Sequence, residues 1–221
     1  MPPRQDEGFG DGAALRARLR DIYWIGGGSG AGKSTIARRI ADQRGLTVYS
    51  TDGAMADHAG RFRAPEAPLL TRFKAMDMNE RWVNRSPQVM LDSFHWFQGE
   101  LFGLIVEDLP RLTTGSAMIA EGFRLLPRLV EPLLVASGHA VWLLPAPQVR
   151  RAAFANRGSL GQIAGKTSDP ETALGNLLVR DEMFTSVIRE ETKRLELPAI
   201  EVDAGMTEDD LARQVSRVLA F

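Results

Sequence analysis

Residues Gly27 to Ser34 read GGSGAGKS, which fits the spacing G-x-x-x-x-G-K-[ST]. Glycines at these positions let successive backbone N–H groups surround phosphate oxygens without interference from side chains. Lys33 would reach the β- and γ-phosphates of a nucleotide, and the Ser34 hydroxyl suits the coordination shell of Mg²⁺. The pattern therefore predicts a P-loop that binds magnesium ATP through Gly27, Gly28, Ser29, Gly30, Ala31, Gly32, Lys33, Ser34 and Thr35, rather than a glycine-rich turn that binds nothing.

The segments on either side of this loop support the prediction. Ile22 to Ile25 is a short apolar run, typical of a strand that is buried on both faces of a parallel sheet. Ser34 to Arg44 places apolar residues at helical spacing and stops at Gly45. A helix that begins at the loop would point the positive end of its dipole at the bound phosphates.

Two carboxylates follow predicted strands. Asp52 comes after the strand Leu46 to Thr51, and Glu121 comes after the strand Ala117 to Ala120. Asp52 is predicted as the general base that accepts a proton from an acceptor hydroxyl, with outer ligation of Mg²⁺ as the alternative. Glu121 takes the place of a Walker B carboxylate that holds Mg²⁺, or it contacts the acceptor; the usual residue is Asp. For both residues a simple turn carboxylate is the alternative.

The remaining pattern alternates strands and helices. Further strands are expected at His139 to Leu144 and Pro198 to Val202; helices are expected at about Ala13 to Arg20, Gln88 to Leu112, Leu125 to Ala136, Gln148 to Asn156 and Pro170 to Leu195, and from Thr207 onward. This alternation predicts the α/β class, with a five-stranded parallel sheet between two helical layers. We expect a tail and short helix over residues 1–20 and one domain over 21–221, with a helical acceptor-binding insert at 53–112 and a lid at 157–170.

The predicted lid lies between arginine-bearing helices. Phosphoryl transfer requires cations near the equatorial oxygens and exclusion of water, and a closing segment with arginines supplies both. Arg157 is therefore predicted to be catalytic, Arg151 to contact ATP and Arg180 to contact the acceptor. The alternative for all of these arginines, Arg150 included, is a solvated helix face.

The predicted insert also contains arginines and aromatic residues. Arg63 and Arg81 are candidates for binding an anionic acceptor, together with Arg61 and Arg85. Trp82, His95 and Trp96 would shape the pocket, although aromatic residues at helical spacing are also typical of a core.

Composition excludes several classes of function. The net charge is -1 and the pI is about 6.3, so no global positive field would attract nucleic acid or anionic lipid. The chain has no cysteine, which excludes disulfides, thiolate metal sites and cysteine nucleophiles. No apolar run approaches the length that spans a membrane, and residues 1–20 lack the features of a signal peptide. A soluble cytoplasmic protein is expected, as a monomer or a dimer.

The chain resembles the P-loop small-molecule and nucleotide kinases. The resemblance rests on the order of five features: the P-loop, the Thr51-Asp52 strand end, the helical insert, Glu121-Gly122 and the arginine-bearing lid. It is most similar in layout to shikimate kinase, gluconate kinase and chloramphenicol phosphotransferase, where an Asp after strand two serves the acceptor. Nucleoside monophosphate kinases are also similar. The resemblance implies strand order 2-3-1-4-5, an adenine site near Arg151 and the Asp203 to Met206 loop, and transfer of the γ-phosphoryl group of Mg-ATP to a hydroxyl of a small metabolite or antibiotic-like acceptor.

Two alternatives remain open at this point. One is a nucleoside or nucleoside monophosphate kinase, and the other, from a different class, is a regulatory P-loop NTPase or ATP-binding module. A GTPase is disfavoured because an N/T-K-x-D motif is absent and Glu121-Gly122 stands where D-x-x-G would begin.

Overall fold

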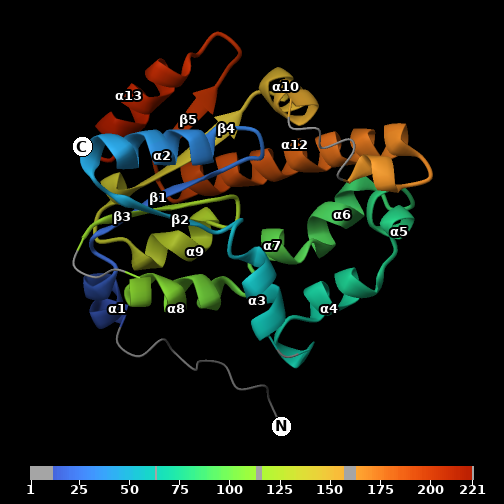
Figure 1. Cartoon of the computed structure of the whole chain (residues 1–221), viewed down its shortest axis with the longest axis horizontal. Helices are drawn as coiled ribbons and strands as arrows, with labels where there is room; N and C mark the ends of the chain where they lie inside the picture. Colours follow the sequence, from blue (N-terminus) through green and yellow to red (C-terminus); the bar gives the residue numbers. More distant parts are fainter. Residues whose placement is uncertain (1–11, 63, 113–115, 157–162, 221) are drawn as a thin grey trace.

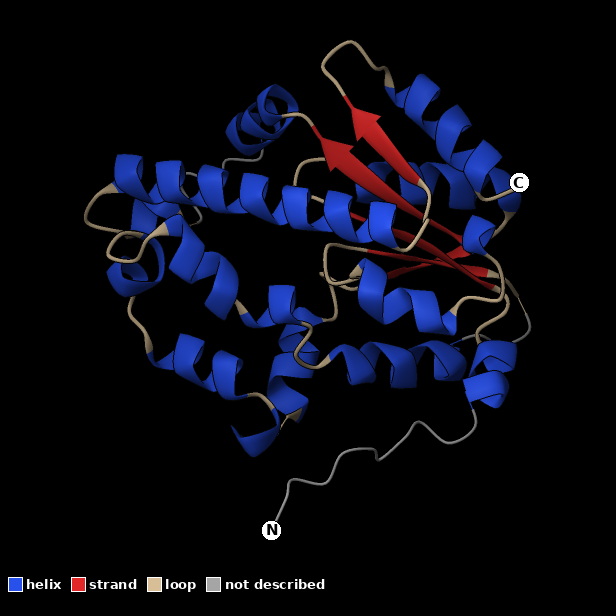
Figure 2. Cartoon of the chain, turned by 180° about the vertical axis from the view of Figure 1, so that it is seen from behind, coloured by secondary structure: helices blue, strands red, loops and turns tan. Residues whose placement is uncertain are grey.

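The computed structural model describes residues 12–62, 64–112, 116–156 and 163–220. Five strands form one parallel sheet, in the order β2-β3-β1-β4-β5. They are β1 (Ile22–Gly27), β2 (Thr47–Ser50), β3 (Met118–Glu121), β4 (Ala140–Pro145) and β5 (Ala199–Val202). The predicted α/β P-loop fold and its strand order are confirmed, and Figure 2 shows the strand arrows pointing toward the same end of the sheet.

Alternate residues of the central strands pack into two separate cores. Trp24 and Trp142 face a core that also contains Phe184, whereas Ile25 and Val141 face the other core. The first core lies against α1 (Gly12–Arg18), α8 (Phe102–Leu112), α9 (Pro127–Val130) and α12 (Pro170–Arg194), and the second against α2 (Lys33–Arg44) and α13 (Glu208–Val218). Burial on both faces explains why these strands are continuously apolar, and it produces a three-layer sandwich.

A run of short helices connects β2 to β3 and extends beyond one end of the sheet, where it lies beside α12 (Figure 1). Helix α6 packs along α12, and α5 does so too. This run, which we call the helical lobe, contains α3 (Met55–Arg61), η1 (Ala64–Glu66), α4 (Pro68–Ala75), α5 (Met78–Trp82), α6 (Pro87–Ser93), α7 (His95–Gln98) and α8. Outside it, the described chain also forms η2 (Glu131–Leu133), η3 (Ser137–His139), α10 (Pro147–Asn156) and η4 (Ala164–Lys166).

The single long helix predicted from Gln88 to Leu112 is wrong. The backbone is extended at Phe94 (φ -80°, ψ 108°), which separates α6 from α7, and it is left-handed at Gly99 (φ 85°), which ends α7. Apolar residues keep helical spacing through both breaks because every segment packs inward. The spacing therefore reports burial here and does not report continuity.

The helix predicted from Leu125 to Ala136 is also mostly absent. One α-helical turn, α9, is followed by the 3-10 turn η2, and Leu134 is extended. Pro132 lacks the backbone N–H that a continuing helix needs, which explains the early end.

No helix in the described ranges combines the length and apolar character needed to cross a lipid bilayer.

Candidate active site

The P-loop joins the end of β1 to the start of α2. Gly27 (φ 123°) lies so close to β4 that a Cβ would stand 2.1 Å from the Leu143 carbonyl oxygen, and Gly30 and Gly32 are left-handed at φ 83° and 82°. Only glycine accepts both demands at low cost. The Lys33 Nζ donates a hydrogen bond to the Gly28 carbonyl at 2.8 Å, so the side chain lies back across the loop. Backbone N–H groups, the N-terminus of α2 and the Lys33 ammonium thus gather where phosphates would bind.

Glu121 lies beside the start of α2. The Ser34 Oγ donates a hydrogen bond to Glu121 Oε2 at 2.9 Å, and Glu121 is only 1% exposed. In the sheet, Glu121 is the register partner of both Ile25 and Ser50. The P-loop after β1 and the end of β3 therefore bring the Ser34 hydroxyl and the Glu121 carboxylate together at the carboxyl edge of the sheet, as expected for this architecture.

Asp52 belongs to the same group. Burial raises the pKa of Asp52, and Glu121 raises it further, while Lys33 opposes the shift. A half-buried carboxylate near a lysine and a second carboxylate has the environment of a general base or a metal-site carboxylate.

Gly122 permits this convergence of strand ends. Its φ is 144°, and a Cβ at this position would lie 1.8 Å from Thr51 Oγ1 and 3.0 Å from Asp52 Oδ1. Any side chain would push the Thr51-Asp52 turn away from Glu121. Steric exclusion, and not turn formation alone, thus explains why glycine follows Glu121 at the end of β3.

Arg124 was missed by the sequence reasoning. It is 2% exposed and donates hydrogen bonds to the Thr51 carbonyl (3.2 Å), His58 Nδ1 (2.9 Å) and the Leu101 carbonyl (3.3 Å). Its guanidinium lies 4.1 Å from the ring centre of Trp96. Burial lowers the pKa of Arg124 to about 10, so it stays charged at neutral pH and exerts its field on Asp52. Only its position, three residues after Glu121, was a signal in the sequence.

Arg124 is held in place by a chain of hydrogen bonds that runs through His58 to Asp108. Because Arg124 can only donate, His58 Nδ1 must accept, and His58 Nε2 then carries the hydrogen that it donates to Asp108 at 2.8 Å. Asp108 also accepts from Arg61 (2.8 Å) and Tyr49 (3.0 Å). The Asp57, His58 and Asp108 cluster has the composition of a metal site, but these hydrogen bonds already engage the oxygens of Asp108 and both ring nitrogens of His58.

One cavity of about 330 Å³ borders the P-loop on the side of β5. Gly30 to Gly32 form part of its wall, and the rest comes from the start of α10 and the segment between β5 and α13: Gln148, Val149, Ala152, Val202, Asp203, Ala204, Met206, Thr207, Glu208 and Leu211. The resemblance implies an adenine site near the Asp203 to Met206 loop, and Asp203, Ala204 and Met206 of that loop line this cavity. Binding of adenine there stays a prediction. Arg151 is exposed and is not part of the wall, although it lies on the same helix.

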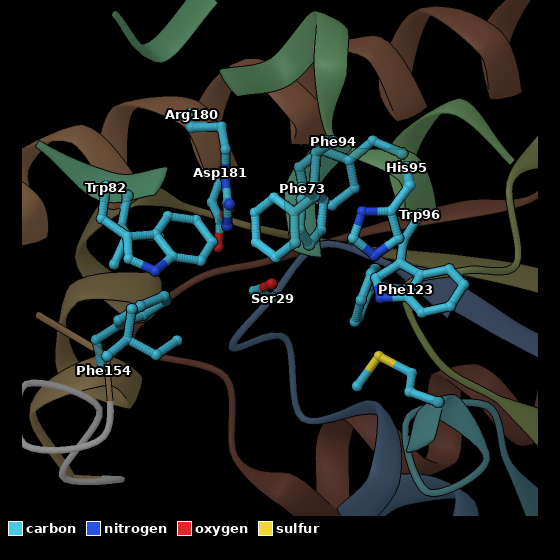
Figure 3. A pocket seen from close by; sticks show the side chains of 14 residues that line it. Ser29, Phe73, Trp82, Phe94, His95, Trp96, Phe123, Phe154, Arg180 and Asp181 are labelled. Atoms are coloured by element: carbon cyan, nitrogen blue, oxygen red, sulfur yellow. The ribbon is translucent and has the colours of Figure 1, made fainter. Parts of the chain in front are cut away.

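A second cavity, of about 310 Å³, borders the same loop at Ser29 and is enclosed largely by aromatic side chains (Figure 3). We call it the aromatic cavity. Met55 and Phe123 line it close to the turns that hold Asp52 and Glu121, and Arg180 and Asp181 reach it from α12. Its other lining residues are Phe73, Trp82, Phe94, His95, Trp96, Phe97, Phe154, Ile163 and Leu177.

The predicted arginines have different fates. Arg180 lines the aromatic cavity, but Arg81 donates to the carbonyls of Phe73 (3.0 Å) and Lys74 (3.1 Å) and does not line it. Arg63 and Arg157 lie outside the described residues, as do all of residues 157–162 of the predicted lid.

Helix α12 also contacts the P-loop directly. A Cβ added to Gly28 would lie only 2.5 Å from Thr185 Oγ1, so the two residues are in close contact. The same Thr185 oxygen accepts a hydrogen bond from Arg150 Nη2 at 2.6 Å. Arg150 is therefore a buried structural residue that braces α12 against α10, as part of the protein interior and not of a solvated face.

Neither the family models nor the curated proteins contain a match to this sequence. Among solved structures, the chain is similar to an uncharacterized protein from Eubacterium ventriosum ATCC 27560, with 15% identity, a TM-score of 0.47 and coverage of 90% of this chain and 97% of that chain. It is also similar to deoxyadenosine kinase from M. mycoides with bound dATP, with 15% identity, a TM-score of 0.47 and coverage of 90% and 100%. At this level of similarity, neither likeness assigns a function.

Proposed function

We propose that this chain is an ATP-dependent phosphotransferase that moves the γ-phosphoryl group of Mg-ATP to a hydroxyl of a small acceptor. The observation that carries this proposal is the position of the P-loop between two cavities: Gly30 to Gly32 border the cavity near β5, and Ser29 borders the aromatic cavity. A nucleotide whose phosphates lie on the loop can place its base in the first cavity. Its terminal phosphate then faces the second.

The residues present fit a magnesium ion. Ser34 Oγ and Glu121 Oε2 are oxygen donors 2.9 Å apart at the start of α2, and Mg²⁺ prefers one or two protein oxygens together with phosphate oxygens. When bound, the ion would neutralise charge on the transferring phosphoryl group. Ser34 and Glu121 are the residues that would hold it.

Asp52 is assigned as the base. The acceptor oxygen forms a bond to the γ-phosphorus while the bond between that phosphorus and the β,γ-bridging oxygen breaks, and ADP leaves with the electron pair. The proton of the acceptor hydroxyl passes to the Asp52 carboxylate. Lys33 stabilises the charge on the phosphate oxygens. Arg124, whose guanidinium lies over Trp96, favours the charged form of Asp52 through its positive charge.

The test is acceptor-dependent release of ADP, measured over a panel of sugars, nucleosides, nucleoside monophosphates and aminocyclitols. Lys33→Ala should abolish ATP binding and turnover, whereas Lys193→Ala, which removes an exposed lysine at the end of α12, should change neither. A regulatory NTPase would release ADP at the same rate with and without every acceptor. That result would contradict the kinase proposal.

A further inference from the structure

Two residues that line the aromatic cavity each carry a buried polar atom with no hydrogen-bond partner among the described residues. These atoms are His95 Nδ1 and Arg180 Nη1, and the residues that carry them are 2% and 6% exposed. Buried polar atoms are normally paired, so unpaired ones that share one cavity need an explanation. A ligand that completes both hydrogen bonds is such an explanation. Figure 3 shows the two side chains reaching the cavity from different elements, α12 and α7.

The positive charge of Arg180 is already balanced. Its Nε and Nη2 donate to Asp181 Oδ1 at 2.9 Å and 2.6 Å, and its guanidinium lies 4.9 to 5.2 Å from the ring centres of Trp82, Phe94 and Phe97. The Nη1 of Arg180, which has no partner in the described part of the chain, therefore offers a directed N–H from a neutral ion pair. Such a donor suits a carbonyl oxygen or a ring nitrogen, and it offers little to a carboxylate or a phosphate.

The lining holds no further cation among the described residues. Arg180 is the only arginine or lysine in that wall, and burial lowers the pKa of His95 to about 3, which keeps its ring neutral. Of the helical-lobe arginines, Arg81 and Arg85 donate to backbone carbonyls and Ser93, and Arg61 pairs with Asp57 and Asp108. An anionic acceptor in this cavity would lose its hydration without gaining a counter-charge, which is costly.

The walls favour a flat ring. Trp82, Phe94, Phe97, Phe123 and Phe154 present aromatic surfaces, against which a planar ring system gains stacking and edge contacts. A volume of about 310 Å³ lies at the small end of the range for ligand sites, enough for one ring system and a short arm. Ser29 and Met55 mark the side from which that arm would reach the γ-phosphate.

We infer that the acceptor is an uncharged, planar aromatic or heteroaromatic alcohol. Its ring lies among the aromatic side chains, one ring heteroatom or carbonyl accepts a hydrogen bond from Arg180 Nη1, and a second polar group on the ring pairs with His95 Nδ1. Its hydroxyl arm extends toward Asp52 and the P-loop. This inference rests on the proposed function, and it separates neutral acceptors such as nucleosides from nucleoside monophosphates.

The first experiment compares matched acceptors for ADP release. The panel contains the ribonucleosides and deoxyribonucleosides, pyridoxine, the 5′-monophosphates of the same nucleosides, and the ring-free controls ribose and myo-inositol. We expect turnover with neutral ring alcohols, and at least about tenfold lower kcat/KM with each monophosphate. Nucleosides and pyridoxine are both neutral heteroaromatic alcohols, and comparing them shows which of the two kinds of ring the cavity accepts. A monophosphate or a plain sugar as best acceptor would overturn the inference.

The second experiment tests Arg180. Arg180→Lys keeps the positive charge but cannot pair with Asp181 and also present the Nη1 donor. We expect the KM of the best neutral acceptor to rise about tenfold while the KM of ATP stays within about twofold. Arg189→Lys, on the exposed part of the same helix, is the control and should change neither value. An unchanged acceptor KM for Arg180→Lys would count against the assigned contact.

A third measurement does not depend on catalysis. Binding of the panel compounds to Lys33→Ala, followed by tryptophan fluorescence, reports on the cavity through Trp82 and Trp96 when transfer is disabled. If neutral ring compounds bind to Lys33→Ala but the native chain turns none of them over, the kinase proposal is refuted and the cavity assignment stands. Absence of ring binding in both proteins would refute the assignment itself.

Discussion

The Ser34 hydroxyl donates a 2.9 Å hydrogen bond to Oε2 of Glu121, a residue that lies 87 positions away in the sequence. The contact exists because β3 lies between β2 and β1, so that the end of β3 meets the start of α2. It joins the phosphate-binding loop to the carboxylate at a neighbouring strand end.

Glu121→Gln tests the role of that carboxylate. The amide keeps the shape and can still accept the Ser34 hydrogen bond, but it lacks the charge that attracts Mg²⁺. We expect the Mg²⁺ concentration for half-maximal turnover to rise, or the turnover rate to fall, by about 10- to 100-fold. Glu131→Gln removes an exposed glutamate and serves as the control. Equal Mg²⁺ dependence in both variants would exclude Glu121 from the metal site.

Asp52→Asn should separate binding from transfer. Lys33 and the loop glycines remain, so ATP affinity should stay within about twofold, while turnover should fall by about 10²- to 10⁴-fold because no base accepts the acceptor proton. Asp92→Asn, at an exposed position, should keep full turnover. Retained turnover in Asp52→Asn would refute the base assignment.

The proposed phosphotransferase activity should also be lost on acidification at an unusually high pH. Burial raises the pKa of Asp52, and the base acts only when it is unprotonated, so kcat/KM should fall as pH falls through a value above the ordinary aspartate pKa of about 3.9. A pH–rate profile measured down to the limit of folding checks this. A flat profile across that region would show that another group takes the proton.

Gly122→Ala should destabilise the fold. The new methyl group would meet Thr51 Oγ1, and φ of 144° is unfavourable for alanine, so we expect a loss of about 1–3 kcal/mol in the free energy of unfolding, measured with urea. Gly175→Ala is the matched control. Gly175 lies in the interior of α12 with nothing within 4 Å of a new Cβ, so this change should stabilise the protein by about 0.5–1 kcal/mol. Equal effects of the two substitutions would argue against the tight turn.

His95 should make the fold sensitive to acid. Burial lowers its folded-state pKa to about 3, whereas the unfolded value is about 6.5, so the folded chain binds fewer protons between these values. The stabilisation is complete above pH 6.5 and is lost as pH falls toward 3, by up to about 1.4 kcal/mol per pH unit. In His95→Gln this slope should shrink by that amount below pH 6, with no change above pH 7. Parallel urea-stability curves at all pH values would contradict the assignment.

Local features of the fold could be predicted from the sequence. The glycine loop, the apolar strands and the capped helix α13 each depend on residues that are close together in the chain, and they appear where expected. The breaks at Phe94 and Gly99 were missed, because inward-facing residues continue through them at helical spacing. Gly99 was the available signal, since its left-handed backbone ends α7.

The site was predictable to a different extent for each residue. Asp52 and Glu121 could be placed because parallel strands end at one edge of the sheet. Arg81 was expected to face the acceptor, yet it caps backbone carbonyls, and Arg124 escaped notice although it is buried beside Trp96. The direction of an arginine side chain depends on tertiary contacts, and neither its type nor its spacing reports them.

Helix α12 places Arg180 in the aromatic cavity and Thr185 against Gly28 of the P-loop. Both residues belong to one uninterrupted helix of 25 residues. If an acceptor pairs with Arg180 as proposed, any displacement of α12 that it causes would also reach the phosphate-binding loop. Thermodynamic linkage then requires reciprocity: the factor by which the acceptor changes the affinity for ATP equals the factor by which ATP changes the affinity for the acceptor.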